Sequence, residues 1–208
     1  MMPLQAKVSP RRSPGRLCTN GGRRLFVPVL YLIPFLLAAG CGRDTPPTDL
    51  VTAGCIDDGE FSANLFGGVE ARLEWREDTL ECDGMPRPHG EGARLHFTGP
   101  ATSNGETLQL TFIIALPDLE EGRSADELPA GVTLIEENAG RFFSTPEPSG
   151  CWADVEQQDA RGHPGDDAHY RIAGLLYCLS PLAEVNGTGS VSFTDLRFAG
   201  RLSWQEPR

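Results

Sequence analysis

The chain has 208 residues, with 29 acidic and 18 basic side chains and a net charge of −11 at pH 7. Six of the basic residues and none of the acidic residues lie in the first 24 positions, and residues 25–40 carry no charge. The chain after residue 40 therefore has 12 basic and 29 acidic residues, which is a net charge of −17. A surface of this sign repels phosphate backbones and anionic lipid head groups, which excludes nucleic acid as a partner.

The first 40 residues have the three parts of an export signal. Basic side chains before position 25 are followed by a 13-residue apolar segment, 25–37, and then by the small residues 38–40. This order is typical of a secretory signal peptide. A transmembrane helix needs about 20 apolar residues, so the segment is too short to remain as a membrane anchor. We therefore expect residues 1–40 to be a signal peptide that is removed on export.

A cysteine follows the small residues directly. The stretch Leu37-Ala38-Ala39-Gly40-Cys41 resembles the lipobox of bacterial lipoproteins. The resemblance implies diacylglycerol transfer to the Cys41 thiol, cleavage before Cys41 and acylation of the new amino terminus. The protein would then be held at the cell envelope by lipid. A glycine, rather than an aspartate, follows the cysteine, which by the same resemblance favours the outer membrane in a host that has one, and otherwise the outer face of the plasma membrane.

Four cysteines remain once the leader is removed and Cys41 carries lipid. In an exported domain, four cysteines predict two disulfides with three possible connectivities. Cys55 and Cys82 are separated by 27 residues, and so are Cys151 and Cys178, which favours these two local pairs. No two of them have the two-to-four-residue spacing of structural zinc sites. We therefore predict two disulfides and no metal or cofactor.

The segment 41–54 is the predicted lipidated N-terminus and tether, because it is polar, has two adjacent prolines and shows no apolar period. Residues 55–208 are expected to form a single domain. Apolar residues alternate with polar ones just before position 66 and again over 69–76, and these two segments are predicted to be the strands of the first hairpin. A three-residue loop over 66–68 would pair Leu65 with Val69 and keep both apolar sets on one face.

Period-two alternation dominates the rest of the domain, and no long helical pattern occurs. A central strand buried on both faces is expected at 107–116, one helical turn at 180–185, and a β-bulge near 194–195 where the apolar phase slips. Further strands are expected at 93–98, 132–135, 141–144, 151–155 and 169–178. Eight or nine short strands separated by Gly, Pro and Asn turns predict an all-β fold, an antiparallel β-sandwich or a small barrel.

No catalytic pattern is visible. The chain has four histidines, no G-x-S-x-G motif and no free thiol once the cysteines pair. The segment 163–169 places His163, Asp166, Asp167 and His169 on one predicted hairpin turn, and these are metal-ligand types. Their spacing matches no metal motif, and Asp and Gly are common in turns, so a solvated hairpin tip is the favoured interpretation.

Trp152 has two possible roles. It is in phase with Asp154, which indicates an outward-facing contact residue, but it also follows Cys151 directly and could cover the disulfide. We predict a partner-binding surface near Trp152 and the hairpin residues His163, Asp166, Asp167 and His169.

These observations favour a lipid-anchored envelope module that binds or supports an envelope protein or a glycan. The alternative is an envelope enzyme whose site is built from loops and has no sequence motif. A solvent-lined cleft with a carboxylate and a histidine would favour the enzyme, and a flat exposed patch around Trp152 would favour the binding module.

Overall fold

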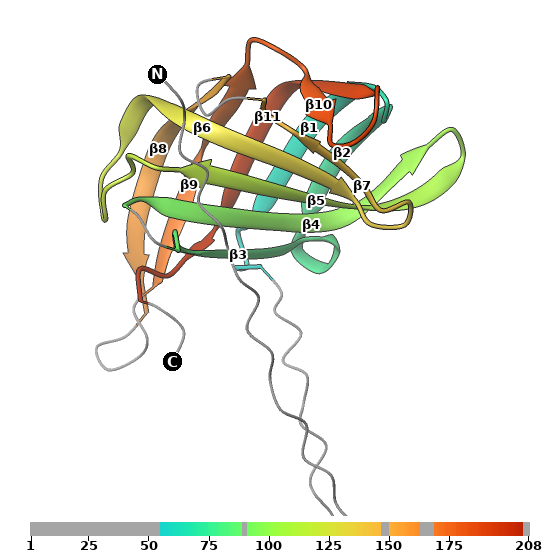
Figure 1. Ribbon diagram of the computed structural model, residues 1–208. Helices are drawn as coiled ribbons and strands as arrows, with labels where there is room; N and C mark the ends of the chain where they lie inside the picture. The colour runs from blue at the N-terminus through green and yellow to red at the C-terminus, as the bar shows by residue number, and fades with distance from the viewer. Residues whose placement is uncertain (1–54, 89–90, 147–149, 163–168, 206–208) are drawn as a thin grey trace, which may run out of the picture. The chain divides into compact units, whose positions relative to one another are not determined.

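The computed structural model describes residues 55–88, 91–146, 150–162 and 169–205, and this part of the chain is all-β, as predicted (Figure 1). It contains eleven strands and one short 3-10 helix, η1 (Glu77–Thr79). No described helix has the length and apolarity that crossing a membrane requires. The strands are β1 (Glu60–Gly67), β2 (Ala71–Arg76), β3 (Glu81–Pro86), β4 (Ala93–Ser103), β5 (Glu106–Leu116), β6 (Ala125–Glu136), β7 (Arg141–Ser144), β8 (Cys151–Arg161), β9 (His169–Cys178), β10 (Leu182–Glu184) and β11 (Ser190–Leu202).

All eleven strands belong to one antiparallel sheet that folds over on itself. The main path runs β2-β1-β11-β10-β7-β6-β5-β4-β3, and β8 and β9 join β6 to β11 by a second route. In Figure 1, β3 to β6 form the front layer, and β1, β2, β9 and β11 cross behind them at a steep angle. At the edges of the path, the Ser203 backbone N–H donates to the Gly84 carbonyl (2.9 Å), which brings β3 against the end of β11. The result is a sandwich-like or barrel-like fold whose two layers are joined on more than one side.

The first hairpin has the predicted faces but a different register. Leu65 pairs with Ala71 and Ala63 with Leu73, so the loop has five residues rather than three. The expected pairing of Leu65 with Val69 is wrong by two positions, which leaves the same side chains facing the core. The reason is tertiary: β1 runs on to Gly67 because it also pairs with β11, and the Gly68 N–H donates to the Ser190 carbonyl (2.8 Å).

The other elements differ mainly in length and number. β4, β6 and β8 are longer than predicted, and β3 and β10 were not predicted. The segment 180–185 is not a helical turn but contains β10, because its backbone pairs with β7 and β11. The predicted bulge is present: the register between β1 and β11 shifts by one residue, and Asp195 adopts a positive φ of 54°. β5 is a central strand, as expected, because it lies between β4 and β6. It is not buried on both faces, since Ile113 and Ala115 on its outer face are only half-buried.

Aromatic rings fill the space between the layers. Phe61 stacks on Trp75 with ring centroids 4.9 Å apart and lies 4.8 Å from Phe112. The Trp75 indole N–H donates to the Pro100 carbonyl (2.6 Å), which satisfies its polar atom within the core. Gly99 is required beside it, because a Cβ at this position would lie 2.5 Å from the indole ring. Trp75 is therefore a core residue that joins edge strand β2 to β4.

Two disulfides link the predicted pairs, Cys55 with Cys82 and Cys151 with Cys178. The first ties the chain just before β1 to β3. The second joins directly opposed residues of β8 and β9 and lies on the inner face, where Cys151 is fully buried. Each link closes a loop of 27 residues within the sequence.

Replacing Cys151 and Cys178 together by alanine should lower the free energy of unfolding by about 3.5 kcal/mol, because the unfolded chain regains the freedom of a 27-residue loop. Urea denaturation of the wild-type and double-alanine proteins measures this difference. Non-reducing peptide mapping should give only the two local links, and a peptide that joins Cys55 or Cys82 to Cys151 or Cys178 would contradict the pairing.

Candidate functional site

Trp152 lies on the outer face of β8. Cys151, Ala153 and Val155 are buried, and Trp152 alternates with them. The residue opposite Trp152 on β9 is Tyr177, and the two rings stack with centroids 6.2 Å apart at an interplanar angle of 22°. Because Cys151 faces the core and Trp152 faces outward, the geometry favours the contact role of Trp152 over a cover for the disulfide.

Carboxylates surround this aromatic pair. Asp154 lies on the same face of β8 and accepts a hydrogen bond from the Glu127 backbone N–H (2.8 Å). Partial burial raises the pKa of Tyr177, and the negative charges of Asp154, Glu127 and Asp126 raise it further. Pro129 of β6 stands opposite Trp152 and extends the apolar surface. We call Trp152, Tyr177, Pro129, Asp154 and Glu127 the β8–β9 surface.

Of the predicted contact residues of the hairpin tip, the structure describes only His169. His163, Asp166 and Asp167 lie outside the described residues. His169 pairs with Arg161 at the far end of the ladder, eight residues along β9 from Tyr177. At about 3.3 Å per residue, this separation is about 26 Å. The structure therefore separates His169 from Trp152.

His169 lies instead beside a cluster of paired charges. It lines a shallow pocket of about 370 Å³ with Asp57, Asp58 and Arg161. An Asp58 carboxylate oxygen lies 2.6 Å from Arg171 Nε and 3.6 Å from Arg161. These ion pairs connect the segment after Cys55 to the β8–β9 hairpin. Within the described ranges, no group of three His, Cys, Asp or Glu side chains could hold a metal ion.

A neighbouring pocket has the residue types of a hydrolase but not the contacts. His169, Ser203 and Asp83 line a space of about 250 Å³. Asp83 is 3.7 Å from Arg201. The Ser203 hydroxyl donates to the Gln205 carbonyl and accepts from the Gln205 backbone N–H. No hydrogen bond joins His169 to Ser203 or Asp83 in the described structure, so a nucleophile–base pair is not assembled there.

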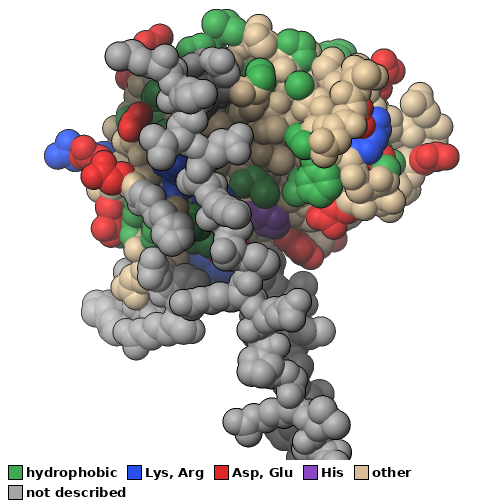
Figure 2. Space-filling view, viewed as in Figure 1, with side chains coloured by type: hydrophobic (Ala, Val, Ile, Leu, Met, Phe, Trp, Pro, Cys, Tyr) green, Lys and Arg blue, Asp and Glu red, His purple; other side chains and the backbone are tan. Residues whose placement is uncertain are grey.

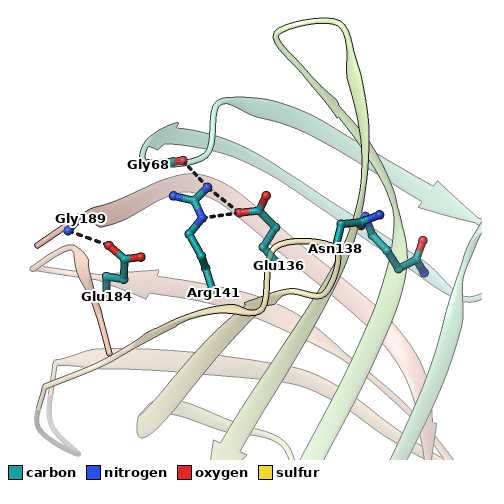
Figure 3. Close-up of polar contacts among 7 residues, drawn as sticks. Gly68, Glu136, Asn138, Arg141, Glu184 and Gly189 are labelled. Carbon is teal, nitrogen blue, oxygen red and sulfur yellow. Dashed lines mark hydrogen bonds and ion pairs between the residues drawn. The ribbon is translucent and has the colours of Figure 1, made fainter. Parts of the chain in front are cut away.

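A buried ion pair organises the end of the domain near the β6–β7 hairpin (Figure 3). The Glu136 side chain is only 6% exposed and accepts a hydrogen bond from Arg141 Nε (2.7 Å), and the same carboxylate oxygen lies 2.5 Å from Arg141 Nη2 in an ion pair. The same guanidinium donates to the Gly68 carbonyl (3.0 Å) and lies over the Phe143 ring. Glu184 accepts from the Gly189 N–H nearby (2.9 Å). These groups satisfy one another, so the cluster holds the β1–β2 loop to the hairpin and offers little to a ligand.

An apolar patch occupies the outer face of the front layer. Hydrophobic side chains gather over the part of this face where β5, β6 and β7 lie (Figure 2). Ile113 and Ile135 are half-buried there, and Phe142 and Val185 are 45% and 51% exposed. The patch offers an exposed aromatic ring, Phe142, away from the β8–β9 ladder.

Gln158 is a buried residue that sequence reasoning missed. Its carbonyl oxygen accepts from the Gly122 N–H (2.8 Å) and the Trp204 indole N–H (2.7 Å), and its amide nitrogen donates to the Glu120 and Arg123 carbonyls (2.9 Å each). One side chain thus fixes the β5–β6 loop and Trp204 against β8. The residues next to Gln158 in the sequence are polar, so the sequence pattern does not indicate that Gln158 is buried. Gln158 faces inward because of the bulge in β8.

No protein-family model matches the chain, and no curated protein or solved structure shows significant similarity to it.

Both described tyrosines should release their phenolic protons at higher pH than usual. A hydrogen bond to the Glu121 carboxylate (2.8 Å), followed by burial, raises the pKa of Tyr170. Glu121→Gln should lower this pKa toward its ordinary value. Glu127→Gln with Asp154→Asn should lower the pKa of Tyr177 only in part, because burial, which is the largest single cause, and the charge of Asp126 remain. Phenolate absorbance during an alkaline titration measures both.

The sign of the stability effect follows from these raised values. The phenols contribute their full stability below the unfolded pKa of about 10, and this contribution is lost as pH rises through the higher folded pKa. Tyrosines that titrate at or below the ordinary value in the folded protein would contradict the described contacts.

Proposed function

We propose that the protein is an exported, lipid-anchored module that binds a partner at the cell envelope through the β8–β9 surface. The observation that carries the proposal is the stacked pair of Trp152 and Tyr177 on the outer face of a disulfide-linked hairpin. Aromatic anchors of this kind dominate the energetics of protein interfaces. Two disulfides in an all-β fold also suit an oxidising compartment outside the cytoplasm.

The rigidity of the β8–β9 surface supports a role in binding. β8 lies between β6 and β9, and β9 lies between β8 and β11, so neither strand is free at an edge. The Trp152 and Tyr177 rings rest on paired backbone directly beside a covalent link. A surface held in this way loses little conformational entropy when a partner binds.

The anchor is the second part of the proposal, and it rests on the lipobox-like sequence. Lipid at Cys41 and the polar tether over 41–54 would keep the domain at a membrane while leaving its surfaces free for a partner. Two or three acyl chains are sufficient for stable attachment, because each buried methylene contributes about 0.8 kcal/mol.

An envelope hydrolase is the second candidate, and the pocket of His169, Ser203 and Asp83 is the observation that favours it. Its mechanism would require the His169 ring to accept the Ser203 proton, a contact that the described structure lacks. Ser203→Ala separates the two functions, because hydrolysis would be lost and binding through the β8–β9 surface would not.

Cys41→Ser should move the protein from the membrane fraction to the soluble fraction or leave its leader uncut, because the serine hydroxyl cannot receive the lipid through a thioether. Fractionation and mass spectrometry of the amino terminus measure both outcomes. A Cys41→Ser protein that is cleaved and membrane-bound like the wild type contradicts the lipid anchor.

Trp152→Ala should weaken capture of the partner about 30-fold, which corresponds to the 2 kcal/mol of a typical interface anchor. Quantitative pull-down from native envelopes measures the loss. The free energy of unfolding should fall by only about 1 kcal/mol, because Trp152 is half-buried and loses one stacking partner.

Phe142→Ala is the matched control, since it removes an exposed aromatic ring from another surface. The β8–β9 surface is not the contact site if Trp152→Ala captures the partner as well as the wild type does. The same conclusion follows if Trp152→Ala and Phe142→Ala lose capture equally.

A further inference from the structure

A concave site lies apart from the residues of the β8–β9 surface. A cleft of about 600 Å³ opens between the end of β3, the loop after β5 and Trp204, which follows β11. This volume falls in the range of sites for small molecules. We call it the Trp204 cleft. Its apolar lining includes Trp204, Pro86 and Pro117, and its carboxylates include Glu91, Asp118 and Glu120.

The indole of Trp204 is fixed in place. Its N–H donates to Gln158 Oε1 (2.7 Å), and its side chain is half-buried against the core. Because the indole N–H is engaged by Gln158, Trp204 lines the cleft with the apolar part of its ring. An indole face attracts organic cations more strongly than any other side-chain ring does.

The acidic side of the cleft is preformed. The Gln158 amide bonds the backbone of Glu120, Gly122 and Arg123, so the loop that carries the carboxylates is held before any ligand arrives. Tyr170 donates to Glu121 (2.8 Å) and fixes a further carboxylate. Preformed sites of this kind bind with a small ordering cost.

The charges of the cleft are only partly compensated. Glu120 lies 3.2 Å from Arg123, whereas Glu91 and Asp118 have no ion-pair partner among the described residues. The chain after residue 40 has a net charge of −17, so its long-range field also attracts cations. A bare metal ion is disfavoured, because no three ligating side chains converge within the described part of the chain.

We propose that the Trp204 cleft binds a linear alkylammonium compound, the chemistry of a polyamine. Ammonium groups would pair with Glu91, Asp118 and Glu120, one of them close to the Trp204 ring. The methylene chain would lie along Pro86 and Pro117. This inference is independent of the β8–β9 surface and of the lipid anchor, because none of its residues belongs to either.

Calorimetric titration of the purified protein with spermidine tests the proposal. We expect saturable binding with one equivalent, and about tenfold weaker binding in both Trp204→Leu and the Glu91→Gln/Asp118→Asn double variant. Trp204→Phe keeps an aromatic face and should lose less. The carboxylate variants change exposed side chains, so they keep the test valid even if Trp204→Leu unfolds.

Trp152→Leu is the matched control, since it removes the tryptophan of the other aromatic surface and should leave spermidine binding unchanged. Repeating the spermidine titration with magnesium chloride present shows how much of the binding is diffuse counterion attraction, because a divalent salt competes for that attraction at equal ionic strength. Full competition by magnesium, equal weakening in Trp152→Leu, or unchanged binding in the carboxylate double variant would overturn the proposal.

Discussion

Two long strands, β6 and β11, hold the domain together because each changes partner along its length. One end of β6 pairs with β8 and the other with β7, while β11 pairs with β9 toward its end and with β10 at its start. The β8–β9 and β7–β10 pairs therefore join the two layers at both ends of these strands. The interior between them is filled by aromatic rings around Phe61, and the remaining edges close through Trp75 and Gly84.

The same constraint positions both proposed sites. β8 must bridge β6 and β9, so its inner residues are buried and Trp152 is directed outward beside Tyr177. The bulge in β8 between Val155 and Gln157 then turns Gln158 inward, where it holds the β5–β6 loop and Trp204. One strand thus supports an aromatic surface near its start and helps to hold an acidic cleft near its end. Both combine an aromatic ring with carboxylates, which suits partners that carry positive charge.

The basic residues of the domain serve mainly as internal partners. Arg141 is bound to Glu136 and the Gly68 carbonyl, and Arg171 contacts Asp58. With arginines engaged in this way, the uncompensated charge on the surface is negative. The field around the domain therefore favours cationic groups.

The sequence by itself determined the strand faces, the all-β class, the two disulfide pairs and the bulge near Asp195, because alternation and cysteine spacing are local patterns. For Trp152 it left two roles open, an outward contact residue and a cover for the disulfide. It could not determine the register of the first hairpin, where pairing with β11 extends β1, or β10, whose short backbone forms a strand only between β7 and β11. Nor could it predict the stacking of Tyr177 on Trp152 or the hydrogen bonds of the Gln158 side chain. Both depend on which strands lie side by side and on a bulge that reverses the inward phase, and only tertiary pairing decides these.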